Sequence, residues 1–324
     1  MSEQEQSGAD GTLGGEPLED EETTQDLQPG ESTSEPDPDL EEHEEGVDDE
    51  EDFVVSVETL EFLEVAIADG VDFSGQDFTG DDLSEGNLSG GLLQECDFTG
   101  ADLSGANFAS ANLAEACFCG ASTANASFES ATLTEADFSA ASIEKANLRL
   151  ASLVEADFSG ATAARADFTS ADLTEACFAG ADVHEAVFAS ATLIEATFSG
   201  AGLARANFHN ATMEAVDLAG CMLRDVNFTG ANLQSADLAG SNARRANFEG
   251  ADLRGADLCG SDLSQANFKG ANIAGAEFCG ASIEGADFTD ANANEADFWG
   301  AEVELARGIT PPKKKKKKKK GKKK

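Results

Sequence analysis

A five-residue word repeats without interruption through most of this 324-residue chain. Ala156–Gly160 reads Ala-Asp-Phe-Ser-Gly, and Ala171–Glu175 reads Ala-Asp-Leu-Thr-Glu. Place one of the word is small and nearly always Ala. Place two is usually Asp, Asn, Ser or Thr, and places four and five are small or polar. Place three runs from Phe73 to Val303 over 47 words, with Phe in 19 of them and Leu in 18. Such a period dictates a stacked, repetitive fold.

A period of five matches neither one face of a helix nor a strand that alternates along its whole length. It matches a short extended edge followed by a corner. Places one and three then point to the same side, because alternate residues of an extended segment do so, and place two points to the other side. Small Ala and large Phe or Leu pointing inward would fill a narrow tube without voids. Place five, rich in Gly and Ser, is predicted to be the corner.

The Ala-(Asp/Asn)-(Leu/Phe)-x-x word resembles that of the pentapeptide-repeat family, over residues 71–310. The resemblance implies an all-β fold, a right-handed quadrilateral parallel β-helix with four words in each coil. About twelve coils would stack roughly 4.8 Å apart, as neighbouring strands do. The ending Leu305–Thr310 is similar to the way such domains commonly close.

The segments outside the repeat differ from it in composition. Residues 1–52 contain 22 acidic residues and no Lys or Arg, and we expect a disordered acidic tail that either solvates the protein or docks on a basic partner. Residues 53–70 are predicted to form a short capping helix ending at Gly70. Residues 311–324 contain 11 Lys, and we expect a second disordered tail that could contact nucleic acid or another anionic surface.

A coil of 20 residues places residue n on residue n+20, so the sequence can be read as columns. One column is a predicted core stack of rings, with a second Phe column on the opposite side. The members of the core stack are Phe98, Phe118, Phe138, Phe158, Phe178 and Phe198.

Two neighbouring columns are acidic and are candidate partner-binding surfaces. The Glu column, at a corner, contains Glu115, Glu135, Glu155, Glu175 and Glu195. The Asp column contains Asp97, Asp137, Asp157, Asp217, Asp237 and Asp257. Like charges about 5 Å apart repel by about 1 kcal/mol per pair in water, so such columns suggest either adaptation to salt or a function.

Three interpretations of the acidic columns stay open. The low Lys content of the body favours a halophilic, salt-adapted surface on a scaffold rod that binds an unknown protein partner. The resemblance offers an alternative, because some pentapeptide-repeat proteins bind DNA gyrase as rod-shaped DNA mimics. Those are usually paired through a C-terminal helix, and none is evident between Ala306 and the Lys tail. The third interpretation is weak cation binding by the Glu column.

A further column has mixed signs, and we expect it to be structural because opposite charges on neighbouring strands stabilise each other. This mixed-sign column contains Lys145, Arg165, Glu185, Arg205, Asp225 and Arg245. Among the seven Cys, Cys96 and Cys221 occupy the inward place one and are predicted core thiols. Cys259 and Cys279 should lie one above the other, but a disulfide between them is not expected in a reducing cell.

No pattern predicts catalysis, and we expect no enzyme activity, no cofactor and no metal site. The three His residues lack partners at ligand spacing, and the Cys residues contain no CxxC pair. No apolar run is long enough to span a bilayer and no secretory leader is visible, so we expect a soluble cytoplasmic protein. The oligomeric state stays open.

Overall fold

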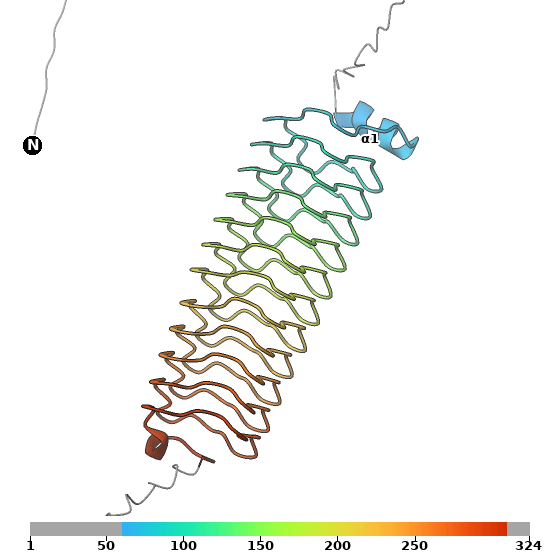
Figure 1. Cartoon of the computed structure of the whole chain (residues 1–324). Coiled ribbons are helices and arrows are strands. Elements are labelled where there is room, and N and C mark those ends of the chain that lie inside the picture. Colours follow the sequence, from blue (N-terminus) through green and yellow to red (C-terminus); the bar gives the residue numbers. More distant parts are fainter. Residues whose placement is uncertain (1–59, 310–324) are drawn as a thin grey trace, which may run out of the picture. The chain divides into compact units, whose positions relative to one another are not determined.

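The computed structural model describes residues 60–309, which Figure 1 shows as a stack of similar laps. Parallel β-bridges join residues 20 apart, as between Asp137 and Asp157, so four words make one lap. Each bridge is isolated, and the described part of the chain contains no longer strand, although the repeat predicted short extended edges. The fold is β-helix-like. Its sides are short because a turn occupies places four and five of every word.

Hydrogen bonds explain why the word has five places. At place three, the N–H of Phe158 donates to the carbonyl of Cys177 in the next lap at 2.7 Å. At place two, the N–H of Asp157 donates to the previous lap, to the carbonyl of Ala136 at 3.0 Å. Ala161, at place one of the following word, donates back to Phe158 at 3.0 Å and closes a four-residue turn. At place five, the N–H of Gly160 also donates to the next lap, to the carbonyl of Ala179 at 2.9 Å. Each word therefore combines three N–H bonds along the stack with one tight turn.

Place five is the corner of each word, as the sequence predicted, and its backbone is left-handed. Gly160 has a φ of 66°, and non-Gly residues at the same place, such as Ser170, have φ near 59°. A turn with positive φ at its third residue favours Gly, because other L-residues are strained there by about 1 kcal/mol or more. The repeat tolerates this strain at 26 non-Gly corners, since stacked neighbours hold every corner in place.

The core consists of places one and three. Phe138 and Phe158 stack with ring centroids 5.0 Å apart and planes 8° from parallel. The Phe columns of opposite sides also touch, since Phe178 meets Phe188 edge to face at 5.7 Å. Both columns are fully buried, and the Ala residues of place one fill the space between the rings. Stacked and edge-to-face contacts are the two arrangements that aromatic quadrupoles favour.

A helix lies at the first lap. Helix α1 spans Leu60–Ala68, inside the predicted 53–70 segment, and its Leu63 and Ile67 are buried against the repeat core (Figure 1). Gly86 occupies the place that Ala usually holds, and a Cβ there would lie 2.7 Å from Leu60 Cδ1. The irregular first words thus make room for α1. Residues 53–59 lie outside the described part.

The last lap ends in the short 3-10 helix η1, Val303–Leu305. Arg307 still forms a bridge with Asp287, so the chain adds one more contact to the stack before the described part ends. The predicted tails, residues 1–52 and 311–324, lie outside the described residues. In residues 60–309, no helix has both the length and the apolar character needed to cross a membrane.

Candidate functional site

The Glu column lies along one corner of the stack, and all five of its side chains are exposed. Their φ angles are 58–60°, in the left-handed region where Gly would be unstrained. The structure adds Glu95, which is exposed, has a φ of 56° and precedes Glu115 by 20 residues. The spacing of 20 could have revealed Glu95, whose own word is irregular because it begins with Gly91 and not with Ala. Six carboxylates thus follow one another over about 24 Å.

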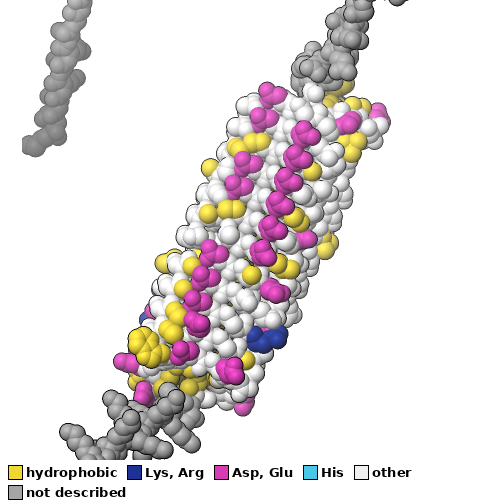
Figure 2. Space-filling model, in the orientation of Figure 1, with side chains coloured by type: hydrophobic (Ala, Val, Ile, Leu, Met, Phe, Trp, Pro, Cys, Tyr) yellow, Lys and Arg dark blue, Asp and Glu magenta, His cyan; other side chains and the backbone are white. Residues whose placement is uncertain are grey.

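None of these six carboxylates has an ion-pair partner or a side-chain hydrogen bond within residues 60–309. Their backbone N–H groups are all bonded to the next lap; the N–H of Glu155, for example, donates to the carbonyl of Thr174 at 2.9 Å. The backbone of this corner is therefore held by hydrogen bonds, while its carboxylates have no partner within residues 60–309. Figure 2 shows acidic side chains in rows along the rod, with few basic side chains on the same face.

The mixed-sign column has the same backbone, with φ of 58–64°, but five of its six members form ion pairs within the column. Glu185 receives Arg165 Nε at 2.7 Å from the lap before and also pairs with Arg205 from the lap after. Arg245 donates two bonds to Asp225, each of 2.6 Å. The hydrogen bond from Arg165 and the charge of Arg205 hold the pKa of Glu185 below its usual value. The charges of this column therefore largely neutralise one another, whereas those of the Glu column do not.

The Asp column has a structural role that its sequence pattern did not reveal. The place-four N–H does not take part in the lap-to-lap ladder, and the side chain at place two accepts it instead. Asp157 Oδ1 accepts the N–H of Ser159 at 2.7 Å, and all six members make the same bond, at 2.7–2.9 Å. Asp and Asn are suited to such turns. The need for this bond explains why Asp and Asn are so frequent at place two of the repeat.

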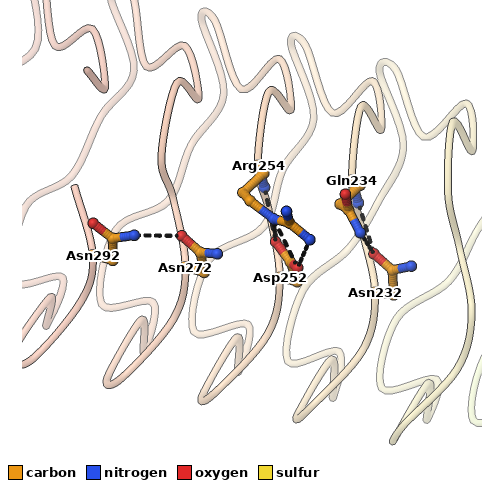
Figure 3. A network of polar contacts seen from close by, with 6 residues as sticks. All are labelled: Asn232, Gln234, Asp252, Arg254, Asn272 and Asn292. Carbon is orange, nitrogen blue, oxygen red and sulfur yellow. Dashed lines mark hydrogen bonds and ion pairs between the residues drawn. The ribbon is translucent and has the colours of Figure 1, made fainter. Parts of the chain in front are cut away.

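On another side of the rod, side chains at place two form hydrogen bonds or ion pairs with neighbouring side chains, as Figure 3 shows. Asn292 Nδ2 donates to Asn272 Oδ1 in the lap before, at 2.9 Å. Arg254 folds back onto Asp252 of its own word, with Nη2 and Oδ2 2.7 Å apart. Within residues 60–309, the Asp column has no such basic partner.

The cysteines fall into two groups. Cys96 and Cys221 are buried at place one, and burial raises the pKa of each to about 11. The other five are partly exposed, and all seven are free thiols. Burial, followed by hydrogen bonds with Cys117 and Asp137, raises the pKa of Cys119 to about 12. The proximity of Cys117 and Cys119 was missed because only CxxC spacing was sought.

Comparisons with known proteins agree with this architecture. The model of the pentapeptide repeat region matches residues 91–168 and 181–258, and that of pentapeptide repeats in eight copies matches residues 151–188 and 261–300. The chain belongs to the pentapeptide-repeat family. No curated protein matches it.

Several solved structures of pentapeptide-repeat proteins are similar to the chain. HetL, involved in heterocyst differentiation regulation in the cyanobacterium Nostoc, is 27% identical over 73% of this chain and 93% of its own, with a TM-score of 0.40. A protein of the Arabidopsis thaliana thylakoid lumen is 30% identical over 32% of this chain and 68% of its own, with a TM-score of 0.26. QnrB1, a plasmid-mediated fluoroquinolone resistance protein, is 18% identical over 71% and 89%, with a TM-score of 0.21.

Proposed function

We propose that the chain is a non-enzymatic scaffold rod that binds a basic segment of a protein partner along its Glu column. The observation that carries this proposal is the row of exposed, unpaired carboxylates from Glu95 to Glu195, held at regular intervals by a rigid backbone. The proposal includes the finer form of the fold, a right-handed, four-sided coil of about twelve laps.

Two energetic costs support a binding role. Each Glu at a corner adds backbone strain of about 1 kcal/mol that Gly would avoid. Each neighbouring pair of carboxylates adds repulsion, which a mixture of signs would turn into attraction. The mixed-sign column avoids the second cost on the same backbone. A basic partner would neutralise the Glu column and convert its repulsion into attraction, and the field of the column would steer the encounter.

Salt adaptation is the second part of the proposal and has a test of its own. If the acidic body is adapted to a halophilic setting, the free energy of unfolding should rise from low to molar salt, because counterions screen the repulsion. We expect the largest rise between low and moderate salt. Equal stability at both extremes would remove this part and leave the binding role untouched.

The DNA mimic remains the alternative, favoured by the neighbouring acidic columns on the rod. Their charge density weighs against it. The Glu column presents one carboxylate per roughly 4.8 Å, whereas duplex DNA carries one phosphate charge per roughly 1.7 Å of its axis. The Asp column adds a carboxylate two residues after only some of these Glu, because Cys117, Cys177 and Thr197 interrupt it. Inhibition of supercoiling by DNA gyrase, lost on neutralising the Glu column, would reverse this preference.

The binding role is tested with the full chain and a labelled oligo-arginine peptide at moderate salt. In the test variant, the five Glu residues of the Glu column are changed to Gln. The control removes the same charge at five other exposed acids, with Glu214, Glu284, Glu302 and Glu304 changed to Gln and Asp290 to Asn. We expect the test variant to bind about tenfold more weakly or worse, since each exposed ion pair contributes up to about 1 kcal/mol. Equal weakening in both variants would show that net charge alone attracts the peptide and would overturn the proposal.

A further inference from the structure

Two thiols and a carboxylate meet on the side of the rod that carries the Asp column. Cys117 Sγ lies 2.7 Å from Cys119 Sγ, and Cys119 Sγ lies 3.0 Å from Asp137 Oδ2. Cys117 and Cys119 are places two and four of one word, and Asp137 lies directly below Cys117 in the next lap. All three side chains are partly exposed, so the cluster is open to solvent on one side.

The same combination recurs further along the rod. The ligand atoms of Cys259, Glu277 and Cys279 also lie within 4.8 Å of one another, and Cys259 Sγ is 3.9 Å from Glu277 Oε2. In both clusters the residues occupy places two and four of the same side. The distance from Cys119 to Cys259 is 140 residues, or seven laps of 20. Each cluster therefore contains two thiols and one carboxylate on the same side of the rod.

The partly exposed cysteines are concentrated on this side. All five, including Cys177, occupy places two or four of the one side, although the rod offers these places on four sides. No Lys or Arg occupies either place on this side within residues 60–309, whereas Asp97 and Asp157 continue the column above and below the first cluster. The corner that follows Cys119 is Gly120, and nothing lies within 4 Å of where its Cβ would be. The side is thus acidic, rich in thiols and accessible.

The donor set suits one class of ion. Two thiolates and a carboxylate, with water as fourth ligand, form a tetrahedral site for Zn²⁺, whose bonds to sulfur are about 2.3 Å long. Thiolates favour such ions over Mg²⁺ or Ca²⁺, which prefer oxygen ligands. A tetrahedral site needs the two sulfurs about 3.8 Å apart, so the thiols would separate by about 1 Å through side-chain rotation.

The first cluster also has the second layer of contacts that orients ligands. Asp137 Oδ1 accepts the N–H of Ser139 at 2.7 Å, and this bond turns Oδ2 towards the thiols. Thr99 Oγ1 lies 3.3 Å from Cys117 Sγ, and Ser139 Oγ lies 3.6 Å from Cys119 Sγ. Hydroxyls near metal-bound sulfur can donate hydrogen bonds that hold the thiolates in position.

We propose that Cys117, Cys119 and Asp137 bind a thiophilic divalent cation of the Zn²⁺ class, and that Cys259, Cys279 and Glu277 form a second such site. Binding replaces the thiol protons of each pair, so two protons are released per ion and no oxidant is required. The two sites are separate from the Glu column, and the proposal does not depend on the peptide-binding role.

Co²⁺ titration of the full chain, with thiols kept reduced by a phosphine, tests the proposal directly. Thiolate-bound tetrahedral Co²⁺ absorbs through sulfur-to-metal charge transfer, which carboxylates of the acidic surface do not produce. We expect this absorption to saturate at two ions per chain and to be displaced by Zn²⁺. Changing Cys117 and Cys119 to Ser should halve it, changing Cys259 and Cys279 to Ser should remove the other half, and the matched control Cys177→Ser should leave it intact.

The single change Asp137→Asn tests whether the carboxylate of Asp137 is a metal ligand or only a neighbour of the site. We expect it to weaken Zn²⁺ binding at the first site by at least the roughly tenfold that outer-layer changes cost. Circular dichroism of each variant checks that the stack remains folded. Absence of the charge-transfer band in the reduced wild-type chain, or a band unchanged by the four Cys substitutions, would overturn the proposal. Rapid pairing of Cys117 with Cys119 into a disulfide that persists in the phosphine would overturn the first site.

Discussion

The Glu column and the mixed-sign column occupy equivalent corners of one repeat and differ almost only in charge. Both lie on left-handed backbone and repeat every 20 residues, although Glu185 and Asp225 of the mixed-sign column are only partly exposed. In the mixed-sign column, Glu185 and Asp225 receive Arg side chains from neighbouring laps, while the Glu column has no such partner in the described residues. In the mixed-sign column, ion pairs between laps stabilise the fold. The Glu column departs from this arrangement, and that departure supports its assignment to binding.

The largest predicted effect tests whether the core contributes equally to stability beneath the two corners. Phe178 lies three residues after Glu175, at place three of the next word, and Phe188 lies at the same position after Glu185. Each ring stacks on two others, with all four centroid distances equal to 4.7 Å. We expect Phe178→Ala and Phe188→Ala each to lower the free energy of unfolding by about 3–5 kcal/mol. Chemical denaturation measures both, and a clearly larger loss at one of them would show that the two corners do not share the same support.

The second prediction tests whether the two corners have the same backbone strain. Glu155 and Lys145 have φ of 60° and 59°. Ala at either position removes the charge and keeps the strain, whereas Gly removes both. We therefore expect Gly to be more stable than Ala by about 0.5–1 kcal/mol at each position, after the greater unfolded-state entropy of Gly is counted. Thermal unfolding of the four variants gives the two differences. A Gly variant no more stable than its Ala counterpart would mean that the strain is absent.

Much of this architecture could be predicted from the sequence, because the repeat ties each place to one direction. The inward places of Phe138 and Phe158 and the corner at place five followed from period and residue size alone. The hydrogen bond between Asp157 and Ser159 did not, since it depends on which backbone N–H groups the ladder leaves unused. The thiol cluster at Cys117 lay within reach of the sequence, because Cys119 is two residues away and Asp137 is 20 residues on in the same column. It was missed because only CxxC spacing was considered.

The smallest predicted effects have opposite signs at the two corners. At low salt and neutral pH, Glu155→Gln should raise the free energy of unfolding by a few tenths of a kcal/mol, because it removes repulsion from the laps above and below. Glu185→Gln should lower the melting temperature, because it removes the shared partner of Arg165 and Arg205. Both shifts should shrink at high salt. Shifts of the same sign would show that overall charge, and not pairing within each column, sets the response.

The pH dependence of the melting temperature gives a further test of the contribution of Glu185 to stability. Its pKa is held below the ordinary value of 4.5 by the hydrogen bond from Arg165 and the charge of Arg205. A carboxyl whose pKa is lower in the folded than in the unfolded chain stabilises the fold at pH values above its unfolded pKa. This contribution declines as the pH falls through the folded pKa. The melting temperatures of the wild type and Glu185→Gln should therefore differ at pH 7 and converge as the pH falls below the folded pKa of Glu185. A difference that persists undiminished in acid would mean that Glu185 acts through packing, and the contrast between the corners would then not be electrostatic.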